Sequence, residues 1–212
     1  MARVSANGDI YKKAQRHLAR RDPVLKKVIA QVGACTLQVD ADHFALLVRA
    51  IISQQISTRA SMSIQARLRQ AVATDGLTPA AILRASEEVL RSAGLSANKA
   101  RSLRDLAEKV HTAAVPLNLL HELPDEEVIG SLLPVRGIGR WTAQMFLIFS
   151  LGRIDVLPVD DLGLRQAVQR NYELEAIPGR DELIELGEAW RPYRSIATWY
   201  FWRSSGPVPQ SK

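Results

Sequence analysis

The sequence contains a single cysteine, Cys35, among its 212 residues. One thiol cannot form an intramolecular disulfide, a four-cysteine iron–sulfur cluster or a cysteine-rich zinc site. The histidines also lack metal-ligand spacing, both with one another and with the carboxylates. These histidines are His17, His43, His111 and His121. We therefore expect no iron–sulfur cluster, no metal held by side chains and a reducing environment.

Long apolar runs are missing as well. A very apolar stretch such as residues 145–151 is far shorter than the roughly 18 residues that a membrane-spanning helix needs. Residues 1–10 contain no apolar core of the kind that a signal peptide requires. With 47% apolar and 24% charged residues, the composition is typical of an ordinary soluble globular protein. A membrane protein, a secreted disulfide scaffold and a disordered chain are excluded.

Charge is distributed unevenly along the chain. Residues 1–30 contain eight Lys or Arg and two Asp or Glu, which accounts for the whole formal net charge of +6. Residues 43–121 carry ten basic and five acidic side chains, whereas residues 122–188 carry six and thirteen. A basic N-terminal half indicates a polyanionic partner such as nucleic acid, although charge alone leaves the identity of that partner open.

Apolar residues recur with helical periodicity, and clean period-two alternation is almost absent. Small polar residues that cap helices precede several of the periodic segments; they are Asp42, Ser57, Thr78, Ser86 and Ser96. The sequence predicts an all-α, multi-helix bundle of about ten helices in two closely packed lobes, with a short extended stretch at 154–159. Its longer helices are expected at about 9–20, 22–32, 43–53, 57–72, 96–114, 141–151, 162–172 and 192–204.

Residues 125–151 predict a helix-hairpin-helix motif around the segment LPVRGIGR at 133–140. Its two glycines permit backbone conformations that other residues resist, and they let a phosphate approach the N–H groups that begin the second helix. Two arginines flank that position and offer further phosphate contacts. We expect the phosphate to be bound by Arg136, Gly137, Ile138, Gly139 and Arg140. The alternative is an ordinary tight turn between two helices.

Four motifs occur in one order along the chain: RAIISQQIS at 49–57, the hairpin, VLPVDDLGLR at 156–165 and WRPYRS at 190–195. Together they resemble the HhH-GPD DNA glycosylase superfamily over about residues 20–204, and within it the 3-methyladenine DNA glycosylase II branch. Larger members carry an N-terminal β-rich domain, for which this chain has no strand pattern. The resemblance therefore implies a compact form, a single glycosylase domain over 1–212 whose first 20 or so residues are a basic helix or extension.

The resemblance also bears on the chemistry of the site. Bifunctional relatives place a lysine at the position of Trp141, where its amine attacks the sugar; an indole cannot act in this way, so the enzyme is predicted to be monofunctional. Alkylated purines such as 3-methyladenine are cationic and stack well on indole rings. We expect the base pocket to be lined by Trp141, Trp202, Met145 and Phe44. The alternative for Trp141 is a buried core aromatic.

Breaking the bond between base and sugar develops oxocarbenium charge, which a fixed carboxylate stabilises while it orients the attacking water. The resemblance assigns this role to Asp161, which directly precedes the LGLR segment. An alignment on Val-Asp, as in the endonuclease III branch, would select Asp160 instead. The remaining alternative is that both aspartates only cap a surface helix.

An enzyme of this class rotates the target nucleotide out of the duplex and fills the vacancy with a side chain. Gln55 matches the intercalating position of the family, with Gln54 as the second choice. Alone, two glutamines at the end of an apolar helix are ordinary solvated residues, so this assignment depends on the resemblance.

The sequence thus predicts a monofunctional DNA glycosylase that excises alkylated purines, such as 3-methyladenine and 7-methylguanine, in the first step of base excision repair. Its expected partner is double-stranded DNA with alkylated bases, and it is expected to act as a monomer in the cytoplasm and nucleoid, or in a nucleus. No cofactor is expected, apart from a monovalent ion that some hairpins of this type hold on backbone carbonyls. The alternatives are a glycosylase for a different base and a non-catalytic DNA-binding module.

Overall fold

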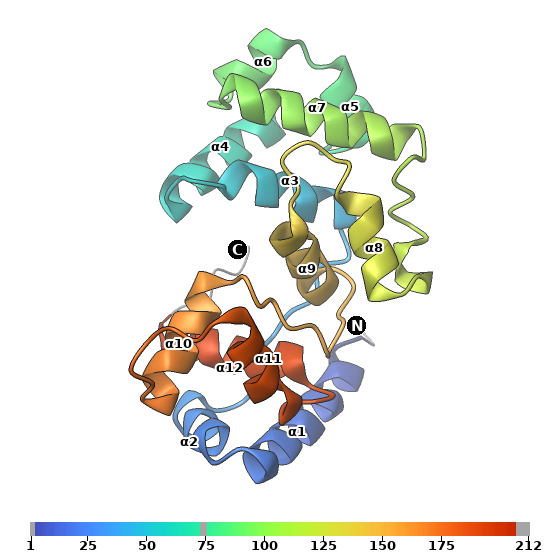
Figure 1. The fold of residues 1–212 in the computed structure, drawn as a ribbon. Coiled ribbons are helices and arrows are strands. Elements are labelled where there is room, and N and C mark those ends of the chain that lie inside the picture. The colour runs from blue at the N-terminus through green and yellow to red at the C-terminus, as the bar shows by residue number, and fades with distance from the viewer. Residues whose placement is uncertain (1–2, 73–75, 207–212) are drawn as a thin grey trace. The chain divides into compact units, whose positions relative to one another are not determined.

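The protein is helical throughout the residues that the structure describes (Figure 1). The computed structural model describes the backbone of residues 3–72 and 76–206, and the side chains from residue 8 onward within these ranges. This part of the chain contains twelve α-helices, one short 3-10 helix and no strand. None of its helices is long and apolar enough to cross a membrane. The predicted all-α class is confirmed.

The chain divides into two compact units. Within the described residues, the terminal unit combines residues 3–39 with residues 152–206, and the central unit is Asp40–Leu151. The terminal unit contains α1 (Arg3–Arg21), α2 (Pro23–Val32), α10 (Leu162–Tyr172), α11 (Arg180–Glu188) and α12 (Arg194–Ser204). The central unit contains α3 (His43–Ser53), α4 (Thr58–Ala71), α5 (Pro79–Arg84), α6 (Glu87–Ser92), α7 (Ala97–His111), η2 (Leu120–Glu122), α8 (Asp125–Leu132) and α9 (Arg140–Phe149).

The helix starts of the central unit follow the predicted caps. The Asp42 carboxylate accepts a hydrogen bond from Ala45 N at 2.9 Å, and Ser57 Oγ accepts one from Ala60 N at 3.3 Å. Thr78, Ser86 and Ser96 cap the helices that they precede in the same way. Each cap satisfies a backbone N–H that the first turn leaves without a partner in its own helix.

The core of the central unit is formed by apolar faces of α3, α5, α7, α8 and α9. Fully buried members of this core include Leu47, Ile51, Ile82, Leu103, Leu106, Val128, Leu132 and Phe146. The packing of α3 against α7 and α9, and of α8 against α9, places the hairpin next to the end of α3.

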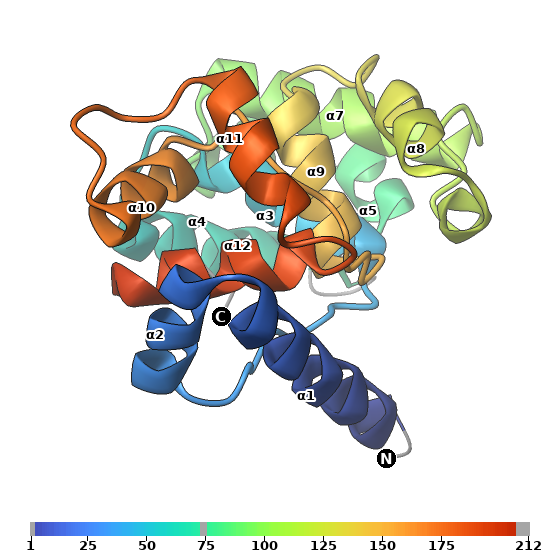
Figure 2. The same ribbon diagram turned by 60° about the horizontal axis from the view of Figure 1, so that its bottom comes forward.

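The terminal unit is organised around α12, against which α1, α2 and α10 pack (Figure 2). Its core is aromatic, with the rings of Trp190 and Phe201 at a centroid separation of 5.0 Å. The buried Asp22 joins these elements, because one carboxylate oxygen caps α2 through Val24 N and the other accepts hydrogen bonds from Trp190 Nε1 and the Tyr172 hydroxyl. A buried carboxylate needs such partners. This cluster therefore has a structural role, in that it connects α2 to Trp190 and to the end of α10.

Two sequence expectations change in detail. The first helix begins at Arg3 rather than at residue 9, and no proline interrupts the residues between. This helix is the predicted basic extension, of which Met1 and Ala2 lie outside the described residues. The stretch 154–159 forms no strand in the described chain and runs as irregular structure; it is held to the start of α12 instead, where Ser195 N donates to the carbonyl of Ile154 at 3.0 Å.

Candidate functional site

The predicted hairpin is present between α8 and α9. Val135 and Ile138 are buried and fix the turn to the central unit, while the two glycines and two arginines around them are exposed. Gly137 has a φ of +81°, and a Cβ on it would lie 2.9 Å from Ser102 Oγ on α7. Glycine is therefore required at this position by the backbone conformation and by the packing beneath it.

Gly139 differs from Gly137 in both respects. It is the N-cap residue of α9 with φ −99° and ψ 176°, a conformation open to any residue, and a Cβ there would meet nothing within 4 Å. No side chain of the described residues caps α9. The absence of a side chain at Gly139 leaves the positive end of the helix dipole and its first N–H groups open to an anion.

The two arginines of the hairpin are placed differently. The Arg136 N–H is already used, since it donates to Asp105 Oδ2 on α7 at 2.7 Å, so only the side chain of this residue is left for a phosphate. The Arg140 guanidinium forms an ion pair with Glu126 at 2.5 Å, with both side chains exposed. Exposed pairs of this kind contribute at most about 1 kcal/mol, which a DNA phosphate can offset.

The two glutamines after α3 occupy different environments. Gln54 Nε2 donates to the carbonyl of Gly137 at 2.8 Å, which ties the residue to the hairpin. Gln55 is exposed and has a φ of +58°, a left-handed conformation that non-glycine residues rarely adopt. Of the two, Gln55 is the side chain directed to the surface. We call residues 54–56 the wedge turn.

Three of the predicted pocket residues belong to the central unit. Trp141 is 44% exposed at the start of α9, so the alternative of a buried core aromatic is wrong. Met145 lies one turn further along the same face of α9 and is buried, as is Phe44 on α3. An indole this exposed on the first turn of a helix does not serve as a core residue, despite its size.

The two aspartates of the terminal unit have opposite environments. Asp161 is 8% exposed and is the N-cap of α10. Its Oδ1 accepts hydrogen bonds from Leu164 N at 2.5 Å and from Trp202 Nε1 at 3.0 Å. Asp160 is exposed and forms an ion pair with Arg180. The structure thus brings Asp161 together with Trp202, the fourth predicted pocket residue, and leaves Asp160 at the surface.

Gly163 keeps the space beside Asp161 open. A Cβ on this glycine would lie 3.2 Å from Asp161 Oδ1 and 3.9 Å from the Trp202 ring. The first contact is tighter than a side chain normally makes, so a larger residue would push the carboxylate aside.

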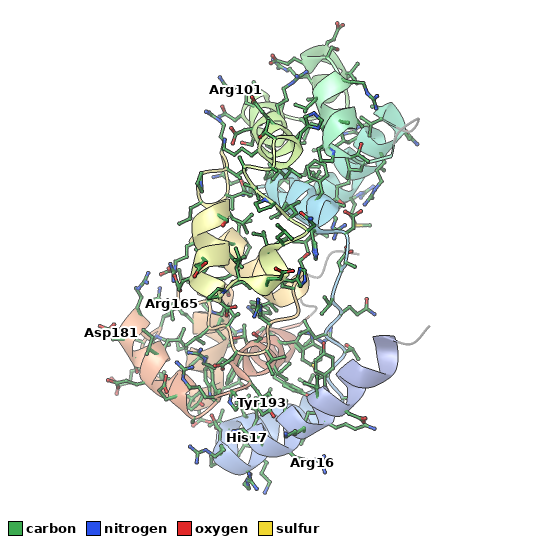
Figure 3. The ribbon with its side chains drawn as sticks, turned by 90° about the vertical axis from the view of Figure 1, so that its right-hand side faces the viewer. Arg16, His17, Arg101, Arg165, Asp181 and Tyr193 are labelled. Atoms are coloured by element: carbon green, nitrogen blue, oxygen red, sulfur yellow. The ribbon has the colours of Figure 1, made fainter. Side chains whose placement is uncertain are left out.

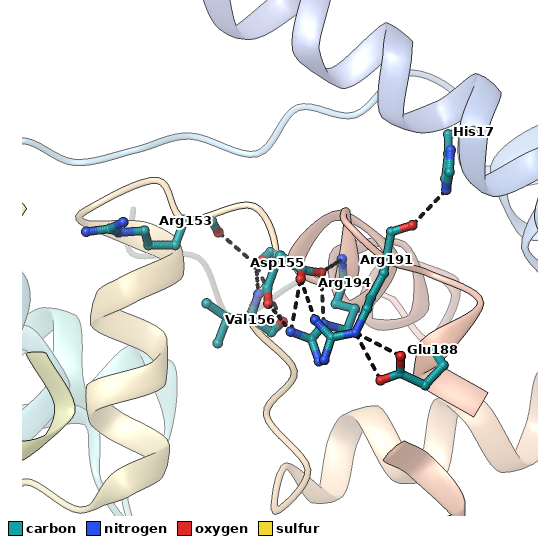
Figure 4. Close-up of polar contacts among 8 residues, drawn as sticks. His17, Arg153, Asp155, Val156, Glu188, Arg191 and Arg194 are labelled. Atoms are coloured by element: carbon teal, nitrogen blue, oxygen red, sulfur yellow. Dashed lines mark hydrogen bonds and ion pairs between the residues drawn. The ribbon is translucent and has the colours of Figure 1, made fainter. Parts of the chain in front are cut away.

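The segment that leads to Asp161 is anchored by a polar network that the sequence did not reveal (Figure 4). Arg194 Nε donates to Asp155 Oδ1 at 2.8 Å, and Arg191 Nη1 donates to Asp155 Oδ2 at 2.9 Å. Ser195 Oγ donates to the carbonyl of Arg153 at 2.7 Å and accepts from Val156 N at 2.9 Å. The WRPYRS motif supplies these groups, and it therefore fixes the backbone a few residues before the aspartates.

Among the described residues, no group of three or more His, Cys, Asp or Glu side chains could hold a metal ion. The sequence also missed Lys99 and Asp105 of α7, whose side chains contact the wedge turn and the hairpin. No local signal could have revealed these contacts, because both residues read as ordinary polar positions of an amphipathic helix.

A helical chain with this hairpin and a buried aspartate at a helix N-terminus defines a class of base excision protein. The chain belongs to the HhH-GPD superfamily of base excision DNA repair proteins, whose sequence model matches residues 48–192. That range includes the wedge turn, the hairpin and Asp161, whereas Trp202 follows it.

Individual relatives are similar over nearly the whole chain. The alkylbase DNA glycosidase-like protein mag2 of Schizosaccharomyces pombe is 33% identical over 198 residues, which cover 91% of this chain and 93% of that protein. DNA-3-methyladenine glycosylase 1 of the same yeast is 35% identical, with coverage of 91% and 87%. The solved structure of the 3-methyladenine DNA glycosylase Mag1 of that yeast, in complex with abasic DNA, matches with a TM-score of 0.83 and 33% identity over 94% of this chain and 100% of the other.

Proposed function

We propose that this protein is a monofunctional DNA glycosylase that hydrolyses the N-glycosidic bond of alkylated purines, such as 3-methyladenine and 7-methylguanine, and so initiates base excision repair. The observation that carries the proposal is the buried Asp161 carboxylate, held by a backbone N–H and the Trp202 indole, in a chain of a base excision family. The names of the 3-methyladenine glycosylases among its relatives support this substrate class.

In the proposed reaction, a flipped nucleotide presents its glycosidic bond to Asp161. The bond breaks with its electron pair leaving on the base, and the positive charge of the alkylated base is thereby neutralised. The sugar becomes oxocarbenium-like, and the Asp161 carboxylate stabilises that charge. Water then adds to the anomeric carbon and loses a proton toward the carboxylate. The two N–H donors on Oδ1 keep the carboxylate oriented, since hydrogen bonds to an ionised acceptor are strong.

Trp141 and Trp202 serve the base rather than the sugar in this proposal. Alkylation makes the purine a cation and a good leaving group, so stacking on an indole contributes binding without a strong general acid. Trp141 offers an exposed ring for this purpose, and the buried Met145 and Phe44 are proposed to supply apolar lining of the pocket. Because an indole cannot attack the sugar, the product is an abasic site in an unbroken strand.

DNA binding is proposed to use the hairpin and the wedge turn together. The first N–H groups of α9 and the side chains of Arg136 and Arg140 would hold a phosphate, with Gly137, Ile138 and Gly139 supplying the backbone. Gln55 would enter the base stack. The exposed side chains of Lys12, Arg16 and Arg20, one turn apart on α1, would add salt-dependent affinity, since like charges at this spacing repel and an anionic partner relieves that repulsion.

We propose further that the two units act as one catalytic domain over 1–212, that the protein works as a monomer on DNA inside the cell, and that it needs no cofactor beyond a monovalent ion on the hairpin carbonyls. Measurement of base release with and without chelator and in different monovalent salts tests the cofactor requirement.

The experiment that tests the function is base release from methylated duplex DNA by the parent protein, Asp161→Asn and Asp160→Asn. Asparagine keeps an oxygen acceptor for Leu164 N and Trp202 Nε1, so Asp161→Asn removes the charge while it retains the cap. We expect free methylpurine from the parent protein, strand breaks only after alkali, and a loss of about 100-fold or more in Asp161→Asn. Asp160→Asn should retain activity.

Loss of activity in Asp160→Asn alone would move the catalytic role to that residue. A parent protein that binds DNA tightly but releases no base from a panel of alkylated, deaminated and mismatched duplexes would make it a binding module. Faster release of a neutral base than of 3-methyladenine would overturn the proposed substrate class.

A further inference from the structure

The wedge turn has an unusual backbone. Non-glycine residues with positive φ cost on the order of 1–3 kcal/mol and persist only where their surroundings hold them. The described chain has three, Gln55, Ala113 and Glu173. The backbone closes the turn at the latter two, through Ala113 N to Val110 O at 3.2 Å and Leu174 N to Gln169 O at 3.0 Å.

At Gln55 a side chain closes the turn instead. The Lys99 ammonium on α7 donates to the carbonyl of Ile52 at 2.6 Å and to the carbonyl of Gln54 at 2.7 Å. These carbonyls lie at the C-terminus of α3, the negative end of its dipole, where a cation is favourable. Lys99 thereby holds the peptide units on the N-terminal side of Gln55 in the conformation that turns this residue to the surface.

The same side of α7 holds the hairpin. Residues three apart on a helix are neighbours on one face, and the next two turns after Lys99 carry Ser102 and Asp105. Ser102 Oγ lies 2.9 Å from the position that a Cβ on Gly137 would take, and Asp105 accepts the Arg136 N–H. Gln54 Nε2, bonded to the carbonyl of Gly137, completes a ring of contacts between α7, the wedge turn and the hairpin.

We propose that the row Lys99, Ser102 and Asp105 on α7 is a brace that keeps the wedge turn and the DNA-binding hairpin at a fixed distance, and that Lys99 is the positioning residue for insertion of Gln55. The proposal rests on the proposed function for the wedge and hairpin roles. The brace would keep the spacing between the wedge turn and the hairpin constant. The wedge role requires this, because the side chain that replaces a flipped nucleotide must enter the DNA at a set distance from the phosphate that the hairpin holds.

The electrostatic state of the brace agrees with this role. Burial lowers the pKa of Lys99, which marks an ammonium that has exchanged part of its water for the two carbonyls. Burial by itself would raise the pKa of Asp105, but the ion pair with Lys109 and the Arg136 N–H outweigh it and leave that pKa lowered. The carboxylate is thus held charged in front of the hairpin backbone.

The test compares Lys99→Met, Lys99→Arg and Arg101→Met. Methionine keeps the length of the side chain but cannot donate, and arginine restores a cationic donor. Arg101 is an exposed cation on the same helix (Figure 3). Its guanidinium contacts Asn98, so its removal matches the change in charge without touching the brace. Each protein is bound to a duplex with a tetrahydrofuran abasic analogue beside 2-aminopurine, whose fluorescence rises as a wedge unstacks it.

We expect Lys99→Met to bind this duplex within about threefold of Arg101→Met but to lose most of the fluorescence rise, while Lys99→Arg recovers it. On methylated DNA, the single-turnover rate of base release should fall by about tenfold in Lys99→Met alone. Thermal unfolding midpoints of all three variants show whether the fold is intact.

A normal fluorescence rise in Lys99→Met overturns the brace, as does a rise that is absent from the parent protein. A rise that depends on Lys99 in a protein that releases no base leaves the brace standing and refutes the proposed function, so the two failures are distinct. Asp105→Ala and Asp105→Asn provide a second arm, because asparagine keeps the acceptor for Arg136 N. Binding to the duplex should weaken about fivefold in the first variant only, and equal affinities would contradict the role of Asp105.

Discussion

The terminal and central units hold their functional groups in opposite ways. In the terminal unit, Asp161 is buried among helix ends and aromatic side chains, and its orientation comes from direct hydrogen bonds to its own oxygen. In the central unit, the side chains of Gln55, Arg136 and Arg140 are exposed, and α7 holds the backbone beside Gln55 and at Arg136. A carboxylate that stabilises charge benefits from exclusion of water, whereas a DNA grip must present its donors to solvent and still remain rigid.

After Asp161→Asn, the largest expected effect is that of Trp202→Phe, which tests the terminal unit. Phenylalanine keeps the aromatic packing but removes the Nε1–H that donates to Asp161 Oδ1. A hydrogen bond to a charged group contributes about 1.5–3 kcal/mol, so we expect the rate of base release to fall by tenfold or more, with unchanged affinity for undamaged duplex. Single-turnover kinetics and a binding titration measure the two quantities. Equal rates for variant and parent protein would mean that the carboxylate is oriented sufficiently without the indole.

The two hairpin glycines allow the central unit to be tested in the same way. Gly139→Ala should change the free energy of unfolding by less than about 1 kcal/mol, because its Cβ enters open space. Its affinity for DNA should nevertheless fall by about tenfold, or 1.4 kcal/mol, since the methyl group keeps the phosphate away from the helix N-terminus.

Gly137→Ala is the matched contrast. Its Cβ would meet Ser102 Oγ at 2.9 Å with a φ of +81°, so this variant should lose stability before it loses affinity. Denaturant unfolding and DNA titration of both variants separate the two roles. A Gly139→Ala protein with parental affinity would show that the phosphate lies elsewhere.

The basic row on α1 tests whether the terminal unit also contributes to the grip. Replacement of Lys12, Arg16 and Arg20 by glutamine should reduce the slope of log affinity against log salt by about 0.9 for each phosphate that is no longer neutralised. The charge-preserving variant K12R/R16K/R20K is the control, and its slope should equal that of the parent protein. An unaltered slope in the glutamine variant would confine the DNA contacts to other surfaces.

The smallest expected effect concerns His43 in the central unit. Its Nδ1 lies 2.7 Å from Ser150 Oγ. Burial lowers the pKa of His43, and the nearby His121 lowers it further. The carboxylates of Asp42 and Asp40 act in the opposite direction but do not reverse the shift in this pKa. The unfolded chain therefore takes up a proton first as the pH falls below about 6.5, so the free energy of unfolding should decrease there. His43→Gln should flatten this dependence in urea titrations between about pH 5 and 7. If the free energy of unfolding depended on pH equally in His43→Gln and in the parent protein, this role of His43 would be refuted.

Much of the fold followed from local sequence rules. The caps at Asp42, Ser57 and Ser96 and the hairpin between α8 and α9 lie where side-chain chemistry and apolar spacing predicted them. Helix starts depend on hydrogen bonds to the next three residues, so a short window of sequence is sufficient. The family could also be predicted from the sequence, because its motifs are short segments that occur in a set order.

The residues of the candidate site could be predicted from the sequence only in part. The sequence left Asp160 and Asp161 as alternatives, and the structure distinguishes them by environment, with one paired at the surface and the other buried beside Trp202. The sequence likewise left Gln54 as the second choice to Gln55 for the wedge. The structure distinguishes them, because Gln54 donates a hydrogen bond to the carbonyl of Gly137. The catalytic and wedge roles themselves stay predictions until the variants are measured.

By itself, the sequence determined the helical class, the hairpin, the family and the small set of residues among which the functional groups are sought. Only the tertiary structure decided which of those residues are buried, which are exposed and which are held by α7. The physical reason is the range of the forces involved. Capping and periodicity act between residues within one turn, whereas the partners of Lys99 lie more than forty residues away, and their meeting depends on how whole helices pack.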